Sequence, residues 1–303
     1  MIKEDDPEII TLSIGDGAND VSMIKEAHIG VGLYGNEGMS AVQSSDFALG
    51  EFKFLWRLLM HHGRLNYMRN AELVLYFFYK NLVLTAPHIY FAGLNGFSGQ
   101  TIYDDFYISF FNLFHTSWPL TIKTMFEQDI SYELDGGQMR KFYPSLYYIG
   151  AKNTIFNWPN YFYHNLLGLI HSILIFYVPV LIFQESLIMG HMGKSVDMSA
   201  INLTSFTCLF GVVTMRLCLL TRWWTWANFF FYSVMSICVY ILFMWVQDFG
   251  IPDSNIKHSA LKLHGSPLFW LTVLLVVGFS FCADCLIEYV SLNFFTTGSD
   301  YVR

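Results

Sequence analysis

Two aspartates, Asp16 and Asp20, lie four residues apart in a glycine-containing stretch that follows an apolar run. Gly15 and Gly17 permit a sharp turn and a close approach of the backbone to a ligand. Paired carboxylates beside a phosphate site suit Mg²⁺, which takes oxygen ligands and bridges them to substrate phosphate. The same spacing also fits an ordinary glycine turn in which Asp20 caps the following helix. The stretch is therefore a candidate magnesium and phosphate site, with a structural turn as the alternative.

The residues around this loop have the pattern of a small α/β layer. The expected elements alternate along the chain: strands over 9–14, 28–33 and 44–49, and helices from about 19, over 37–43 and over 52–62. In α/β folds, ligands bind at the carboxyl ends of parallel strands, where helix amino termini favour phosphate. The position of Asp16 just after the first strand supports the phosphate-site interpretation.

The rest of the chain is too apolar for an ordinary soluble domain, with 54% hydrophobic, 18% aromatic and only 14% charged residues. A membrane span uses about 20 apolar residues. Six stretches are long enough or nearly so: 71–93, 104–126, 161–185, 200–221, 224–247 and 267–290. We therefore predict a membrane α-helical bundle of six transmembrane helices over 71–290, preceded by a partial α/β segment over 1–70 and followed by a short tail over 291–303.

The positive residues are unevenly divided between the two sets of loops, and Lys and Arg in short loops favour the cytoplasm. Positive charge is dense before the first apolar stretch and recurs in the loop that holds Arg140, Lys141 and Lys152, whereas the opposite loops hold little. Both chain ends are therefore expected in the cytoplasm. The net charge of −7, without clustered Lys and Arg, argues against a nucleic-acid partner.

Lys80 lies in the middle of the first apolar stretch, where its ammonium cannot easily reach water, and Asn81 follows it directly. An ionisable residue at such a depth is by default a functional-site hypothesis. The alternative is a packing lock with a carboxylate or a helix carbonyl. Asn112, in the second stretch, is a weaker candidate for the same polar path, since hydrogen bonding between helices explains it equally well.

Several blocks of the sequence resemble one family in the same order. GDGANDVSMI (15–24) resembles the phosphorylation-domain hinge of P-type ATPases, and HIGVGLYGNEGMSAVQSSDFAL (28–49) resembles that of type IV members, the phospholipid flippases. FYKNLVL (78–84), NGFSGQTIYDDF (95–106) and FYPSLYYIG (142–150) are similar to the same family. The resemblance implies that the α/β segment is the end of a HAD-like phosphorylation domain.

The resemblance also implies roles for individual residues. Asp16 is expected to bind the Mg²⁺ that accompanies the phosphoryl group, with Asp20 beside it, while Asn19 and Asp20 contact phosphate and orient the site. Lys80 and Asn81 are expected in the path of the lipid headgroup. The implied activity is ATP-driven movement of phospholipid from the outer or lumenal leaflet to the cytoplasmic leaflet through an aspartyl-phosphate cycle. A glycosylated accessory beta subunit is a further implied partner.

Two family motifs are missing from the sequence: D-K-T-G-T, which holds the phosphorylated aspartate, and D-G-E-T of the dephosphorylating domain. The chain therefore resembles the carboxyl-terminal portion of a flippase and is expected to hydrolyse no ATP by itself. Two alternatives stay open: an inactive truncated membrane scaffold or regulatory module, and part of a flippase–cyclase fusion. The sequence leaves open the lipid and the membrane, plasma membrane or endomembrane.

Overall fold

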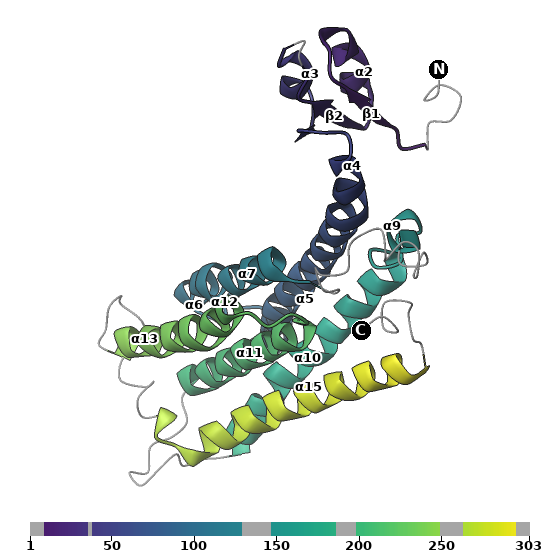
Figure 1. Cartoon of the computed structure of the whole chain (residues 1–303). Coiled ribbons are helices and arrows are strands. Elements are labelled where there is room, and N and C mark those ends of the chain that lie inside the picture. Colours follow the sequence, from purple (N-terminus) through teal and green to yellow (C-terminus); the bar gives the residue numbers. More distant parts are fainter. Residues whose placement is uncertain (1–8, 36–37, 129–146, 186–197, 249–262, 295–303) are drawn as a thin grey trace. The chain divides into compact units, whose positions relative to one another are not determined.

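The structure is a computed structural model that describes residues 9–35, 38–128, 147–185, 198–248 and 263–294. The chain divides into two compact units. We call the described residues up to Asn66 the head, and those from Tyr67 onwards, apart from Tyr147 of the first unit, the bundle. Figure 1 labels their helices and strands.

The head contains a parallel three-stranded sheet in the order β1 (Leu12–Gly15), β2 (Ile29–Leu33) and β3 (Phe47–Leu49). Gly15, the last residue of β1, pairs with Gly32 of β2, so the two strands end within one residue of each other. The prediction of three short strands is confirmed, although β1 begins at Leu12 rather than Ile9. Because parallel strands end at one edge, the loop after β1 opens at the carboxyl edge of the sheet, where α/β folds place their ligands.

Short helices connect the strands of the head. They are η1 (Ala18–Asp20), α2 (Val21–Glu26) and α3 (Ser40–Gln43), followed after the sheet by α4 (Phe54–Arg57) and the π-helical η2 (Leu58–Gly63). Ile24, Val31 and Ala41 are buried and form a small core between these helices and the sheet. Gly30 lets α2 approach β2 closely, because a Cβ at Gly30 would lie 2.6 Å from the Ile24 side chain.

The described secondary-structure elements of the bundle are all helices. They are α5 (Arg64–Leu94), α6 (Asp105–Phe110), η3 (Phe111–Ser117), α7 (Trp118–Phe126), α9 (Tyr148–Ala151), α10 (Trp158–Glu185), α11 (Met198–Leu220), α12 (Trp226–Phe229), η5 (Phe230–Met235), α13 (Ser236–Asp248) and α15 (Pro267–Phe294). η3 and η5 are π-helical. Pro119 follows η3 and has no N–H to donate to the carbonyl of His115, which explains why the regular α-helical pattern is interrupted there.

Within the described ranges, three helices are long and apolar enough to cross a membrane: Trp158–Phe183, Met198–Leu220 and Pro267–Phe294. They correspond to three of the six predicted spans. The predicted span 71–93 lies in α5, while 104–126 and 224–247 fall on helices that η3 and η5 divide into shorter pieces. The structure therefore supports the helical class with three candidate spans, and the count of six and the domain limits at 70 and 290 stay predictions.

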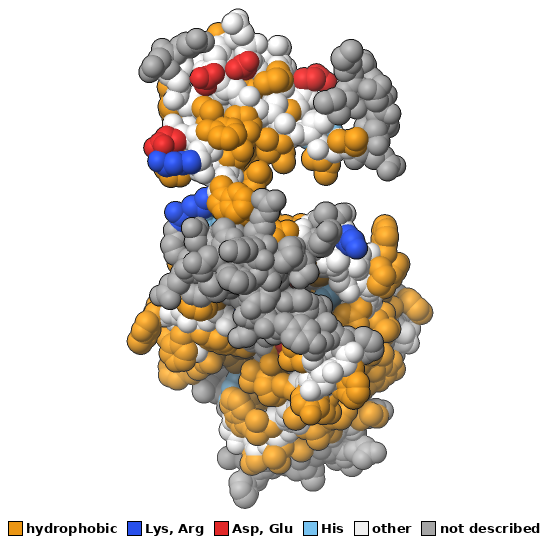
Figure 2. All heavy atoms as spheres, turned by 45° about the vertical axis from the view of Figure 1, so that its right-hand side comes forward, with side chains coloured by type: hydrophobic (Ala, Val, Ile, Leu, Met, Phe, Trp, Pro, Cys, Tyr) orange, Lys and Arg blue, Asp and Glu red, His pale blue; other side chains and the backbone are white. Residues whose placement is uncertain are grey.

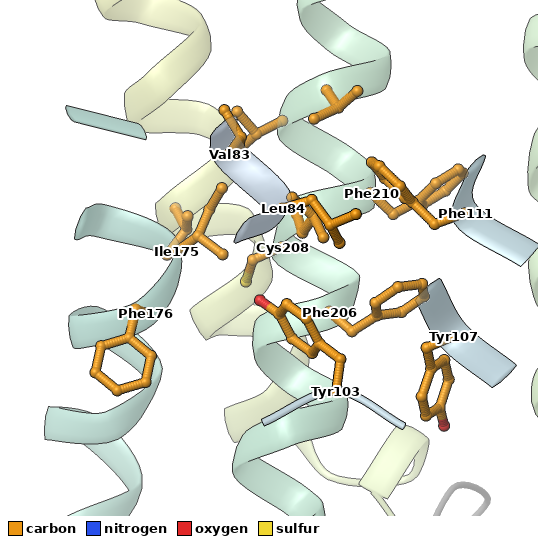
Figure 3. Close-up of a cluster of buried hydrophobic side chains, with 14 of the residues drawn as sticks. Val83, Leu84, Tyr103, Tyr107, Phe111, Ile175, Phe176, Phe206, Cys208 and Phe210 are labelled. Atoms are coloured by element: carbon orange, nitrogen blue, oxygen red, sulfur yellow. The ribbon is translucent and has the colours of Figure 1, made fainter. Parts of the chain in front are cut away.

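The core of the bundle is apolar, with many aromatic side chains, and gathers around α11 (Figure 3). Phe206 of α11 lies 4.6 Å, ring centre to ring centre, from Tyr107 and 5.8 Å from Tyr103. Of the most apolar part of α11, 67% is buried inside the bundle, against 22% for α15. α11 is thus the central helix, whereas α15 leaves most of its apolar surface exposed. Figure 2 shows the largely hydrophobic surface on one face of the bundle.

Candidate functional site

The aspartate loop is held closed by Asp20. Its Oδ2 accepts hydrogen bonds from the backbone N–H groups of Asp16, at 3.2 Å, and Gly17, at 3.4 Å. The side chain makes no capping bond to α2, so the alternative in which Asp20 caps that helix is not observed there; the carboxylate instead turns back onto the loop and bonds Gly17, which precedes η1. Gly15 makes this possible, because a Cβ there would lie 2.3 Å from the Cβ of Asp20.

The Asp16 carboxylate remains available for a ligand. It is exposed and has no hydrogen bond from the described side chains, and Asn19, three residues later on η1, is also exposed. Gly35 leaves room at this carboxylate, since a Cβ at Gly35 would lie 3.2 Å from Asp16 Oδ2. Mg²⁺ uses one or two carboxylates and completes its shell with water and phosphate. The exposed carboxylate of Asp16, next to Gly35 at the carboxyl edge of the parallel sheet, is therefore suited to bind Mg²⁺.

Lys80 is buried inside the bundle, with 2% of its surface exposed. Its ammonium donates to Thr116 Oγ1 at 2.8 Å and to Asn112 Oδ1 at 3.2 Å. The nitrogen also lies 5.1 Å from the centre of the Phe77 ring, within reach of a cation–π interaction. Among the described residues, no carboxylate forms a salt bridge with Lys80. The described residues therefore do not pair Lys80 with a carboxylate in a purely structural role.

The partners of Lys80 come from the π-helical segment η3. Asn112 and Thr116 are four residues apart and point to the same neighbour on α5, as side chains at this spacing share a helix face. π-helical turns occur frequently at functional sites. Asn112 is a candidate from the sequence alone, whereas Thr116 and Phe77 are not. The spacing of Thr116 from Asn112 was the available signal, but a threonine in an apolar helix more often bonds its own backbone.

Asn81 lies apart from this cluster. It is half-buried, its carbonyl accepts from Thr85 Oγ1 at 2.9 Å, and its side-chain amide makes no hydrogen bond to the described residues. Lys80 and Asn112 are thus brought together, as are Asp16 and Asp20, whereas Asn81 joins neither group. The two groups belong to different units, the bundle and the head.

Residues 42–297 match the family described as phospholipid-translocating P-type ATPase C-terminal. The chain is 39% identical to phospholipid-transporting ATPase IC of Xenopus tropicalis, over 94% of this chain and 22% of that protein. It is 36% identical to phospholipid-transporting ATPase IC of Homo sapiens, over 97% of this chain and 23% of that protein. It is 40% identical to probable phospholipid-transporting ATPase 7 of Arabidopsis thaliana, over 88% and 21%. The chain therefore spans less than a quarter of the length of these relatives.

Proposed function

This chain belongs to the phospholipid-translocating P-type ATPases and matches the carboxyl-terminal region of these proteins. We therefore propose that it forms part of a transporter that moves phospholipid at the expense of ATP. The direction is from the outer or lumenal leaflet to the cytoplasmic leaflet. The observation that carries the proposal is the buried ammonium of Lys80, whose described partners are neutral oxygens and an aromatic ring.

A buried cation with neutral partners is suited to an anionic ligand. Burying an ammonium costs free energy unless it is paired, and Asn112 and Thr116 offer dipoles rather than a charge. A lipid phosphate supplies the missing negative charge, and Lys acts on phosphate as a compact cation with rotatable donors. Asn81, on the same helix, has a side-chain amide without a described partner and is proposed to add a hydrogen bond to the headgroup path.

The head is proposed to support the phosphoryl-transfer site of the complete transporter. Asp16 would hold Mg²⁺, whose positive charge offsets the charge of the transferred phosphoryl oxygens. Asp20 keeps the loop closed through the N–H groups of Asp16 and Gly17, and so orients Asp16. Asn19 is exposed on the same loop, where it is proposed to contact phosphate. ATP and the phosphorylated aspartate belong to the complete transporter, in which this chain supplies the Mg²⁺ carboxylate.

The membrane arrangement is part of the same proposal. Six spans, both chain ends in the cytoplasm, and a glycosylated accessory beta subunit are proposed alongside the three candidate spans. The competing function is a membrane scaffold without catalysis. A scaffold tolerates the loss of the Asp16 carboxylate, whereas a transporter does not.

The test uses the complete transporter that carries this chain, reconstituted in liposomes. Lys80→Met is expected to raise the lipid concentration for half-maximal ATPase stimulation by about tenfold or more, because it removes a charge-assisted hydrogen bond. Lys80→Arg retains the charge and is expected to retain part of the response. The exposed Lys152 provides a matched control, Lys152→Met, with no expected effect.

Asp16→Asn separates the transporter from the scaffold. It is expected to abolish lipid-dependent ATP hydrolysis while lipid binding persists. Normal turnover in Asp16→Asn would overturn the catalytic role of the head, and an unchanged lipid response in Lys80→Met would overturn the path through Lys80.

A further inference from the structure

Polar contacts connect α5 with the helix that runs through η3 and α7 at three levels. Arg69 contacts Glu127, Glu72 contacts Lys123, and Lys80 contacts Thr116. We call these contacts the polar ladder. Only the last one belongs to the Lys80 site already described.

The first contact caps α7. The main-chain carbonyl of Glu127, just after the last residue of α7, accepts from Arg69 Nε at 2.8 Å and Nη2 at 2.6 Å. A guanidinium is well suited to such a carbonyl, because the end of a helix carries unpaired carbonyl groups and a partial negative charge. Arg69 therefore fixes the end of α7 against the first turns of α5.

The second contact is an almost completely buried ion pair. Lys123 Nζ lies 2.6 Å from Glu72 Oε2, and the side chains are 3% and 14% exposed. The connection between α11 and α12 completes the network. Arg222 Nη1 lies 3.4 Å from Glu72 Oε1, and Glu127 Oε1 accepts from the backbone N–H groups of Arg222 and Trp223. The charges are thus enclosed by three segments of the bundle.

The contacts are in register along two antiparallel helical segments. The Glu72–Lys123 and Lys80–Thr116 contacts are separated by eight residues along α5 and by seven residues along the opposite helix. The Arg69–Glu127 and Glu72–Lys123 contacts are separated by three residues along α5 and by four along the opposite helix. A slip of one residue moves a helix by about 1.5 Å and turns it by about 100°, which would separate Lys80 from Thr116.

We propose that Glu72 and Lys123 are positioning residues for Lys80: their buried ion pair sets the register of α5 against η3 and α7, and thereby presents the Lys80 ammonium to Asn112, Thr116 and the lipid phosphate. The inference rests on the proposed function of Lys80. Hydrophobic burial in the core has no direction and by itself constrains the register weakly, whereas a buried ion pair is favourable only when its two charged groups are well aligned. The ion pair therefore acts on lipid affinity without touching lipid.

The experiment measures half-saturating lipid and ATP concentrations in the complete reconstituted transporter. Lys123→Met and Glu72→Gln are each expected to raise the half-saturating lipid concentration by about tenfold, with that for ATP unchanged. Lys123→Arg retains the ion pair and is expected to keep the half-saturating lipid concentration close to that of the wild type. The matched control is Glu51→Gln, which breaks the Lys53–Glu51 pair of the same 2.6 Å length on the exposed surface of the head.

A double-mutant cycle separates positioning from general stability. If Lys123 acts through Lys80, adding Lys123→Met to Lys80→Met produces no further rise in the lipid requirement. Additive effects, or equal losses for lipid and ATP, would overturn the inference. Glu72→Gln preserves the shape of the side chain and gives the same comparison if Lys123→Met does not fold. An unchanged lipid response in Lys80→Met overturns the proposed function itself, so the two failures are distinguishable.

Discussion

Arg216 Nη1 of α11 lies 3.1 Å from Asp284 Oδ1 of α15, and both side chains are buried in the bundle. His171 Nε2 of α10 lies 3.7 Å from the same carboxylate oxygen. The other nitrogen of the ring, Nδ1, is 2.7 Å from the hydroxyl of Tyr79 on α5. One polar chain thus joins four helices, and it ends at the residue next to Lys80.

Asp284→Asn is expected to destabilise the bundle, because it leaves the Arg216 guanidinium buried without a counter-charge. Removing one partner of a buried ion pair costs about 3–5 kcal/mol. Thermal unfolding of the detergent-purified complete transporter measures the loss. Glu288→Gln, one turn further along the same helix at an exposed position, is the matched control. Equal unfolding temperatures for the two variants would contradict a structural role of the pair.

Gly32→Ala is expected to disrupt the head. A Cβ at Gly32 would lie 2.7 Å from the Cα of Val42 in α3, which is backbone and cannot move aside as a side chain can. The expected cost is about 1–3 kcal/mol, the usual range for overpacking. Because the head is destabilised, formation of the phosphoenzyme in the complete transporter is expected to fall as well. Gly50→Ala, where a Cβ meets nothing within 4 Å, is expected to leave both the stability and the phosphoenzyme formation unchanged.

Thr116→Val tests the contact that holds the Lys80 ammonium. The substitution keeps the shape of the side chain and removes the hydroxyl that lies 2.8 Å from Lys80 Nζ. The half-saturating lipid concentration is expected to rise about tenfold or more, since a hydrogen bond to a charged group is lost. Thr124→Val is the control, because among the described groups the Thr124 hydroxyl bonds the carbonyls of Leu120 and Thr121 in its own helix and no other. A larger effect at Thr124 would count against the Lys80 site.

The buried carboxyl group of Glu127 is expected to make the stability of the protein depend on pH. Burial raises the pKa of its carboxyl group, although the charge of Lys123 and the backbone N–H of Arg222 oppose the rise. A raised pKa in the folded state favours folding at pH below the unfolded pKa, and this contribution is lost as pH rises through the folded pKa. The wild type is therefore expected to lose stability relative to Glu127→Gln as pH rises from about 4. Thermal unfolding of both proteins across this range measures the difference, and a difference independent of pH would refute the expectation.

Much of the head was predictable because its signals are local. The apolar runs that end at Gly15 and Leu33 predict strands by their length and composition, and the glycines around Asp16 predict a turn. The role of Asp20 was not predictable from spacing. A carboxylate at this position suits a helix cap and a loop closure equally, and only the backbone path of the loop brings the N–H groups of Asp16 and Gly17 to its oxygen.

The sequence by itself determined the helical class of the bundle, the depth of Lys80 in an apolar stretch and the family, since these depend on residues that are neighbours in the chain. Only the tertiary structure decided which groups meet. Lys80 and Thr116 are 36 residues apart, and Lys123 and Glu72 are 51 apart. Such pairs depend on the rotation and register of one helix against another. Packing sets both, and the periodicity of a single helix leaves them free.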